Sequence, residues 1–313
     1  MPSSDAVSVR RSNPLTTCLD ALPITAVVLT VALWWLGWPG IANSDGEVPP
    51  LEVIPAESAE QLENVFSQAG YLWPARNVPP LAITAFPPDL DEVAPDQRKS
   101  LFFRATLPLV LAENQRIRQQ RARLRLALGD RLPQQRRLNI LRELAEEYDV
   151  EGDLLAPQTQ QTLKRRVDIV PPALALAQAA KESGWGTSRF AQEGNNLFGE
   201  WTWNAALGLV PEDRPAGADH YVRAFDTPRQ SVRSYLNNLN SHPAYARFRQ
   251  LRARANANGR AMDPAIMTAG LERYSQRGWD YVHEVRAMIE SEQLHHAVAD
   301  ARLSRDASRV ALR

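Results

Sequence analysis

Cysteine, histidine and net charge are all scarce in this chain, and each scarcity excludes a class of protein. The 313 residues include a single cysteine, Cys18, which excludes a disulfide framework and a cysteine-ligated metal site. The five histidines show no HxxxH or HExxH spacing, so zinc is not expected either. Basic and acidic residues balance at 36 each, so no global field favours nucleic acid. We expect no metal, no cofactor and no nucleic-acid partner.

One uncharged apolar run, ALPITAVVLTVALWWLGW over residues 21–38, lies near the N-terminus. Its roughly 18 residues are enough to span a bilayer as a helix. Two arginines precede it and two acidic residues follow it, so the positive-inside rule leaves residues 1–20 in the cytoplasm. We expect 21–42 to be a transmembrane helix in the inner membrane that exports the rest of the chain to the periplasmic side. The alternative is a signal sequence cleaved after the small residues at 40–42, which would give a secreted protein.

Proline content and helical periodicity divide the remaining chain. Residues 43–95 are rich in proline and acidic residues, which predicts an extended linker with one short helix at Ala56–Ala69. Residues 96–165 show helical periodicity and are predicted to form a helical accessory region, whose first helix Pro108 should break or kink. A second helical domain is expected over 166–291, followed by a C-terminal tail at 292–313.

Five arginines are concentrated on the first helix of the accessory region, which permits two interpretations. They are Arg116, Arg118, Arg121, Arg123 and Arg125. The simpler interpretation is a solvated helix face, and the other is contact with an anionic polymer or a membrane surface.

An unusually apolar helix is predicted to lead into a single acid, Glu182. Pro171-Pro172 suits a first helical turn, residues 173–180 are almost entirely apolar, and Gly184 should end the helix. Burial and the negative end of the helix dipole both disfavour an ionised carboxyl. A carboxyl that stays neutral near pH 7 can act as a general acid, although an exposed glutamate without a role is the alternative.

Amides and aromatic residues follow this acid closely. They are Trp185, Asn195, Asn196, Phe198, Trp201 and Trp203. Carbohydrate sites pair such amides with flat aromatic surfaces, because sugars present hydroxyls on their edges and C–H groups on their faces. Core packing is the alternative for Trp201 and Trp203. The glycines and prolines of Glu200–Phe225 predict a small irregular or β lobe inserted between helices.

Several motifs together resemble one known family. AQAAKESGWGTSRFA, GNNLFG and the downstream YSQRGWDY resemble the bacterial peptidoglycan N-acetylglucosaminidases, glycoside hydrolase family 73. LPLVLAENQRIRQQR, NNLFGEWTW and SVRSYLNNLNSHPAYARFR are similar to its Bax-type branch. The resemblance implies a mainly α, lysozyme-like fold whose catalytic domain, residues 166–291, binds peptidoglycan glycan strands. It implies hydrolysis of the β-1,4 bond between N-acetylglucosamine and N-acetylmuramic acid.

The resemblance also assigns roles to individual residues. Glu182 matches the general acid, and Tyr281 matches the catalytic tyrosine of the cleft. Tyr274 matches the other tyrosine of that motif and is assigned to substrate binding or packing, although the two tyrosines could exchange roles. Residues 276–278, Gln-Arg-Gly, depart from the usual Thr-Asp stretch of the family. The predicted substrate-binding residues are Trp185, Asn195, Asn196, Phe198, Trp201, Trp203 and Tyr274.

The second catalytic carboxylate is left open by the sequence. The candidates are Glu200, Glu212, Asp213 and Asp219. Catalysis assisted by the substrate's own N-acetyl group would need none of them. Carboxyl separation distinguishes retaining enzymes, at about 5–5.5 Å, from inverting enzymes, at about 6.5–9.5 Å. Two other functions remain: a lytic transglycosylase or muramidase on the same fold, and a non-catalytic wall-binding morphogenesis protein.

Overall fold

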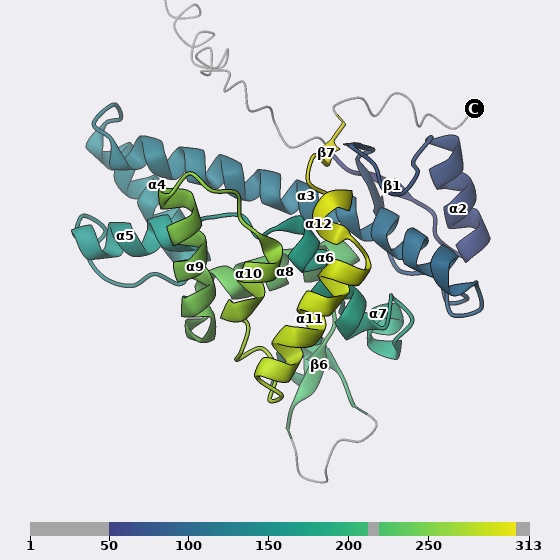
Figure 1. The fold of residues 1–313 in the computed structure, drawn as a ribbon. Helices are drawn as coiled ribbons and strands as arrows, with labels where there is room; N and C mark the ends of the chain where they lie inside the picture. Colours follow the sequence, from purple (N-terminus) through teal and green to yellow (C-terminus); the bar gives the residue numbers. More distant parts are fainter. Residues whose placement is uncertain (1–49, 212–218, 305–313) are drawn as a thin grey trace, which may run out of the picture. The chain divides into compact units, whose positions relative to one another are not determined.

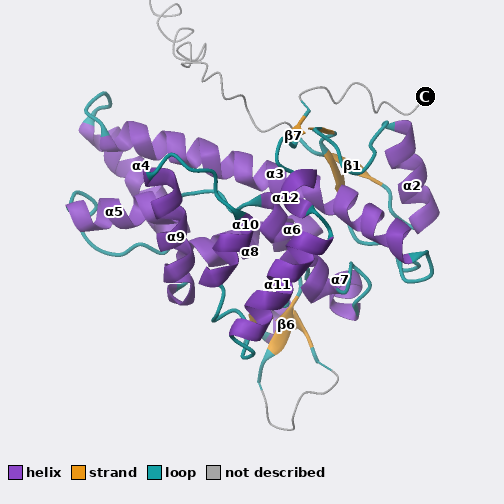
Figure 2. Cartoon of the chain, in the orientation of Figure 1, coloured by secondary structure: helices purple, strands orange, loops and turns teal. Residues whose placement is uncertain are grey.

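A computed structural model of the chain describes residues 50–211 and 219–304 (Figure 1). These residues belong to one compact unit, Glu47–Arg313, and they are mainly helical, as predicted (Figure 2). The predicted membrane helix at 21–42 lies outside the described residues. None of the described helices combines the length and the apolar character needed to cross a bilayer.

The longest helix is α3 (Pro95–Leu128), which runs across the upper part of Figure 1. It begins with proline at its first position, where the missing N–H costs nothing. The predicted break at Pro108 is wrong, because the helix continues through this residue. Leu107, Pro108 and Leu109 are all buried, so packing on every side offsets the hydrogen bond that proline cannot donate.

The two halves of α3 contribute to different hydrophobic cores. Its C-terminal half packs with α4 (Gln134–Glu147) and α5 (Pro157–Arg166), through residues such as Leu124 and Leu141. Its N-terminal half, including Phe102, belongs to the larger core that surrounds α6. The helix therefore connects the accessory helices to the rest of the fold.

Residues 50–94 are not an extended linker, which corrects the prediction for the described part of 43–95. β1 (Glu52–Ile54) pairs in parallel with β3 (Leu81–Ile83), and α2 (Ala59–Gln68) lies at the predicted short helix with Ser58 as its N-cap. The apolar residues of this segment, among them Phe66, are buried in the larger core. Composition alone misled the prediction, because the prolines set local extended geometry while α3 buries the apolar residues spaced between them.

The residues after 291 are also more ordered than the predicted C-terminal tail. α12 (Leu294–Ala297) follows α11, and β7 (Arg302–Leu303) pairs in parallel with β2 (Asn77–Val78). The C-terminal end of the described chain therefore forms a small sheet with residues of the segment before α3.

The remaining helices surround α6 (Pro172–Ser183), which packs against α3 and against α11 (Trp279–Ser291). Residues 173–180 of α6 are buried, as its apolar sequence predicted. The other helices here are α7 (Arg189–Gly194), α8 (Pro228–Ser241), α9 (Ala246–Ala257) and α10 (Pro264–Met267). Single 3₁₀ turns lie at Ala205–Leu207, Pro243–Tyr245 and Thr268–Gly270.

The predicted lobe is a small antiparallel sheet. Its strands are β4 (Trp201–Thr202), β5 (Gly208–Leu209) and β6 (Tyr221–Arg223), with β6 in the centre. Gly208 is required for its close approach to β6, because an added Cβ would lie 2.5 Å from the Cβ of Tyr221. In Figure 1 this sheet projects from the lower side of the helical body.

Candidate active site

Glu182 lies in the last turn of α6, next to the residue that stops the helix. Gly184 adopts the left-handed conformation, with φ of 59°, and ends α6 there. Burial raises the pKa of Glu182, while a hydrogen bond from Tyr281 and the charge of Lys181 act in the opposite direction. The Oε1 atom is buried and has no hydrogen-bond partner among the described residues. A carboxyl whose pKa is raised and which has one uncommitted oxygen is suited to proton donation.

A chain of hydrogen bonds orients this carboxyl. Tyr235 donates to Gln178 Oε1 at 2.6 Å, and Gln178 Nε2 donates to the hydroxyl of Tyr281 at 2.9 Å. Tyr281 uses its own hydrogen toward Glu182. Gln178 and Glu182 are four residues apart and therefore share one face of α6.

Four tyrosine rings form a cluster around the acid. Tyr274 stacks on Tyr281 with ring centroids 5.3 Å apart, and its edge meets Tyr235 at 6.5 Å. Tyr245 lies 6.0 Å from Tyr274. The Tyr274 hydroxyl donates to the carbonyl of Phe198 at 2.9 Å, so this ring also holds the NNLFG loop. The burial of these hydroxyls explains why their pKa values lie above the ordinary value.

Glu200 is a second perturbed carboxyl, at the first residue after NNLFG. Burial raises its pKa to about 7, against the effects of a hydrogen bond from Ser234 at 2.7 Å and of the Arg223 charge 3.7 Å away. Its Oε1 atom is buried without a partner among the described residues. The charges of Glu200 and Glu182 both raise the pKa of Tyr245, so this hydroxyl is within electrostatic reach of both carboxyls.

The other candidates for a second carboxylate differ from Glu200. Asp219 is exposed, and Glu212 and Asp213 lie outside the described residues. Glu200, whose side chain is 13% exposed, is therefore the one candidate in the described part of the lobe that is mostly shielded from water.

Three residues of the NNLFG loop that were predicted to contact sugar also have partners within the protein. Asn196 donates to the carbonyls of Glu200 and Arg223 and accepts from the N–H groups of Phe198 and Glu200. Asn195 donates to the carbonyls at positions 225 and 226. Phe198 is buried and stacks on Tyr235 at 3.8 Å. These side chains attach the lobe to the helical body, and both ends of the Asn196 amide have partners within the protein. The Asn195 Oδ1 atom is buried without a partner among the described residues, so sugar contact stays a prediction for this loop.

The tryptophans fall into two groups. The ring of Trp185 meets Phe102 and Phe103 of α3 edge-on, with Lys99 over its face, so packing accounts for its position. Trp201 and Trp203 are 54% and 71% exposed on the lobe, and Trp201 stacks on His220. The alternative prediction that Trp201 and Trp203 pack in the core is therefore wrong. Substrate contact stays a prediction for all three tryptophans and for Tyr274.

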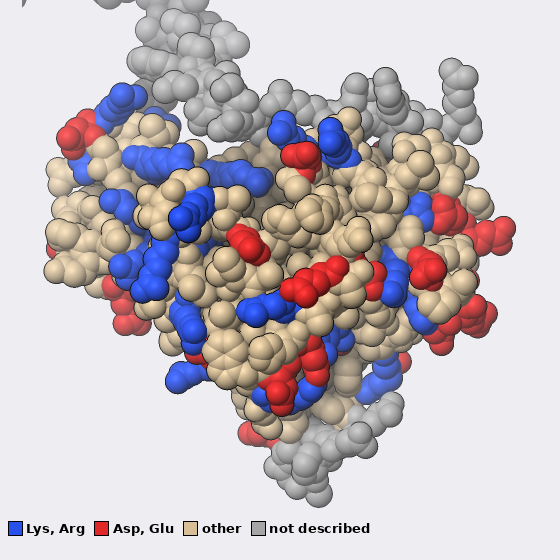
Figure 3. Space-filling model, viewed as in Figure 1, with Lys and Arg blue, Asp and Glu red and all other residues tan. Residues whose placement is uncertain are grey.

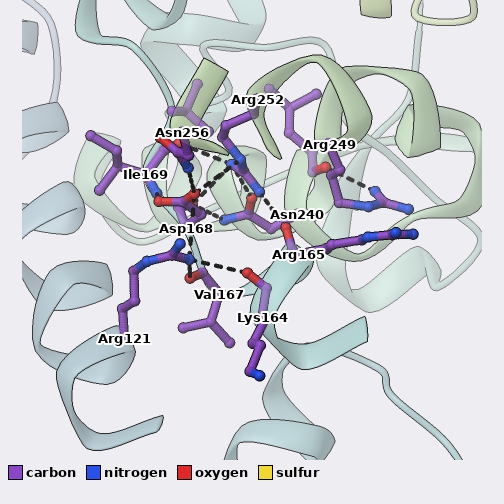
Figure 4. A network of polar contacts seen from close by, with 12 residues as sticks. Arg121, Lys164, Arg165, Val167, Asp168, Ile169, Asn240, Arg249, Arg252 and Asn256 are labelled. Atoms are coloured by element: carbon purple, nitrogen blue, oxygen red, sulfur yellow. Dashed lines mark hydrogen bonds and ion pairs between the residues drawn. The ribbon is translucent and has the colours of Figure 1, made fainter. Parts of the chain in front are cut away.

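Three of the five arginines singled out on α3 bind carboxylates or carbonyls of the chain itself. Arg116 pairs with Glu113 and Glu147, Arg123 pairs with Glu143, and Arg121 lies 3.3 Å from Asp168. Figure 4 shows Asp168 enclosed by Arg121, Arg252 and Asn256 just before α6 begins. The fully buried Arg252 donates to the carbonyls of residues 165, 168 and 169. This network fixes the start of the helix that carries Glu182.

Sequence reasoning missed Gln178, Glu200 as the favoured carboxyl, and the pair Tyr235 and Tyr245. Gln178 had a usable signal, because it is the single polar residue within the apolar run and lies one turn before Glu182. No feature of the sequence indicated that Ser234 and Arg223 would contact Glu200. Within residues 50–211 and 219–304, no three His, Cys, Asp or Glu side chains lie close enough together to hold a metal ion.

Comparison with known proteins identifies the family of this chain. The model of the Glucosaminidase family, described as mannosyl-glycoprotein endo-beta-N-acetylglucosaminidase, matches residues 156–294. The chain is 32% identical over 199 residues to "Protein bax" of Escherichia coli (strain K12), an alignment that covers 63% of this chain and 70% of that protein. No solved structure gives a significant match, so the lysozyme-like fold stays a prediction.

Proposed function

The chain belongs to the glucosaminidase family, in its Bax-type branch, and from this premise we propose that it is an endo-β-N-acetylglucosaminidase of peptidoglycan. Membership in the family indicates glycoside hydrolase chemistry on a glycan. The proposed reaction is hydrolysis of the β-1,4 bond between N-acetylglucosamine and N-acetylmuramic acid.

The observation that carries the proposal is the environment of Glu182. Burial raises the pKa of this carboxyl, Tyr281 orients it, and its Oε1 atom is uncommitted. Glu182 would donate its proton to the glycosidic oxygen as the bond from the anomeric carbon of N-acetylglucosamine to that oxygen breaks. Water would add to the anomeric carbon and lose a proton to a base, and Glu182 would be reprotonated from solvent before the next turnover. Gly199 supports access, because a Cβ there would come within 3.8 Å of the Glu182 Oε2 atom.

Glu200 is the proposed partner of Glu182. A carboxyl with a pKa of about 7 is poised to accept a proton from water near neutral pH. Ser234 and Arg223 fix one of its oxygens, which leaves the other for that water. The exposed rings of Trp201, on β4, and of Trp203, just after this strand, would lie against the faces of the sugars.

The site of action is proposed from the sequence at 1–42. Export through the apolar run would place the domain on the periplasmic side of the inner membrane, where it meets peptidoglycan, with residues 21–42 as the anchor. Cleavage of this segment would release a secreted enzyme instead. Fractionation of cells that express the chain, with mass determination of its N-terminus, distinguishes the two.

Digestion of purified sacculi tests the proposed activity. We expect the full-length protein to release fragments with N-acetylglucosamine at the reducing end, as identified by mass spectrometry. Glu182→Gln should lower the rate on the order of 10²–10⁴-fold, because glutamine cannot donate the proton. Glu290→Gln, which changes an exposed glutamate of α11, is the matched control and should retain the wild-type rate.

Other products would indicate another function. Fragments that end in 1,6-anhydro-N-acetylmuramic acid would assign the chain to lytic transglycosylases, and N-acetylmuramic acid at the reducing end would indicate a muramidase. If the wild type releases no more fragments than Glu182→Gln, the protein is a non-catalytic wall-binding protein and the proposal fails.

A further inference from the structure

A groove of about 410 Å³ runs along the outer face of α9, beside the tyrosine cluster. Arg247, Gln250, Leu251 and Arg254 line it, because positions i, i+3, i+4 and i+7 fall on one side of a helix. The other wall is the turn that contains Glu272 and Arg273.

The groove has an excess of positive charge. Arg247 pairs with Glu272 at 2.9 Å and lies over the half-exposed ring of Trp279, 5.4 Å from its centroid. Neither Arg254 nor Arg273 has a carboxylate partner among residues 50–211 and 219–304. In Figure 3, several blue side chains gather on the side of the molecule where Figure 1 places α4 and α9.

The other arginines of α9 provide a contrast. Arg249 and Arg252 point inward and donate to backbone carbonyls, including those of residues 239 and 168. The inner arginines therefore have structural partners, while Arg254 and Arg273 keep their hydrogen-bond donors available to a ligand.

The groove is connected to the proposed catalytic acid through the tyrosine cluster. Tyr245 immediately precedes α9, and Tyr274 immediately follows the turn at 272–273. These two rings are 6.0 Å apart, and Tyr274 stacks on Tyr281, which donates to Glu182. Two ring contacts thus connect the wall of the groove to the tyrosine that orients the acid.

We propose that this groove is a subsite for the carboxylate-bearing peptide attached to N-acetylmuramic acid next to the cleaved bond. This inference rests on the proposed function, since the peptide is part of the peptidoglycan strand. Guanidinium groups bind carboxylates in a bidentate manner, so Arg254 and Arg273 would each donate hydrogen bonds to a peptide carboxylate. A glycan without peptides offers only the lactyl carboxylate beside each sugar ring, whereas the peptide carries carboxylates farther from the ring, so the enzyme would prefer peptide-bearing strands.

Binding of fluorescent glycan strands to the full-length Glu182→Gln protein tests the subsite without turnover. Strands that carry their peptides are compared with the same strands after an amidase has removed them. We expect about tenfold tighter binding of the peptide-bearing strands, equivalent to about 1.4 kcal/mol. Adding Arg254→Gln and Arg273→Gln should bring this ratio close to one. Arg125→Gln, which removes an exposed arginine of α3, should keep the ratio of the parent.

Equal binding of both strands to the parent, or an unchanged ratio after loss of the two arginines, overturns the subsite. So does loss of the preference when inorganic phosphate is added at constant ionic strength, since that result indicates a general anion site. These outcomes are separate from a failure of the proposed function, which appears as absence of cleavage by the wild-type protein.

Discussion

At the scale of single residues, the site depends on carboxyls whose protonation the fold controls. Burial at a helix end raises the pKa of Glu182, and burial between the lobe and α8 raises the pKa of Glu200. A hydrogen bond from Tyr281 lowers the pKa of Glu182, and Ser234 and Arg223 lower the pKa of Glu200. Each acid is therefore held between desolvation, which favours its neutral form, and hydrogen bonds, which favour the ion.

Tyr281→Phe tests the control of Glu182. Loss of the hydrogen bond removes an interaction that favours the carboxylate, so the pKa of Glu182 should rise further. The alkaline limb of the kcat/KM profile should move up by roughly one pH unit, the value of a hydrogen bond to a charged group. Tyr148→Phe removes a comparable buried hydroxyl, which donates to Gln120 in the smaller core, and should leave the limb in place. An unmoved limb in Tyr281→Phe would contradict the orienting role.

Glu200→Gln tests the cost of the second carboxyl. The folded-state pKa of about 7 is above the ordinary 4.5, so the contribution of Glu200 to stability is full below about pH 4.5 and is lost as pH rises through 7. Glutamine does not ionise, so the Glu200→Gln variant does not lose this stability as pH rises. Between pH 5 and pH 8 the variant should gain on the order of 1–3 kcal/mol of unfolding free energy relative to wild type, measured in urea.

Asp219→Asn, a change of an exposed carboxyl on the same lobe, is the control and should follow the wild type at both pH values. If Glu200→Gln differs from wild type by the same amount at pH 5 and pH 8, Glu200 is not the strained carboxyl described here.

At the scale of elements, the segment 84–94 supports the turn that follows Glu182. Phe86 and Leu90 pack against Gly186, whose φ is 82°, and Gln192 of α7 donates to the carbonyls of residues 87 and 88. A Cβ at Gly186 would lie 2.8 Å from the ring of Phe86. The turn after the acid is therefore shaped by residues almost a hundred positions earlier in the chain.

A double-mutant cycle measures this contact. Gly186→Ala should cost roughly 1–2 kcal/mol for the left-handed backbone and about 1–3 kcal/mol more for overlap with Phe86. In a Phe86→Val background the overlap is relieved, so the same change should cost on the order of 1 kcal/mol less. Gly70→Ala has a similar φ of 63° and nothing within 4 Å of its added Cβ, so it reports the backbone cost alone. Additive costs at Gly186 and Phe86 would show that the two do not touch in solution.

At the scale of the whole molecule, one core unites distant parts of the sequence. It contains residues from Ile54 to Val298, and α6 packs against both α3 and α11. The segment that matches the family, 156–294, is therefore only part of the folding unit. Without α3 and the segment before it, the core-facing surface of α6 would meet water.

Two fragments test this unity. We expect residues 47–313 to unfold in urea with one cooperative transition followed by circular dichroism. A fragment of 156–294 should show no such transition, because it lacks Phe102, Phe103 and the other partners of its core. A cooperative transition in the shorter fragment would mean that the catalytic segment is an independent domain.

The sequence by itself determined the individual helices and the motifs that identify the family. The apolar run, its proline start and its glycine stop define α6, and the amphipathic patterns define α4, α5, α8 and α11. The motifs around Glu182 and NNLFG also indicated the family. These features depend on residues within a few turns of one another, so their information is present in short stretches of sequence.

The tertiary structure alone decided what each polar and aromatic group does. Asn195, Asn196 and Phe198 resemble sugar contacts in sequence, yet they hold the lobe in place. Glu200 was one of four equal candidates until Ser234, 34 residues away, and burial distinguished it. Residues 50–94 read as a linker until their partners on α3 were known. Desolvation and hydrogen-bond pairing are properties of the assembled fold, and no local pattern specifies which distant group will supply them.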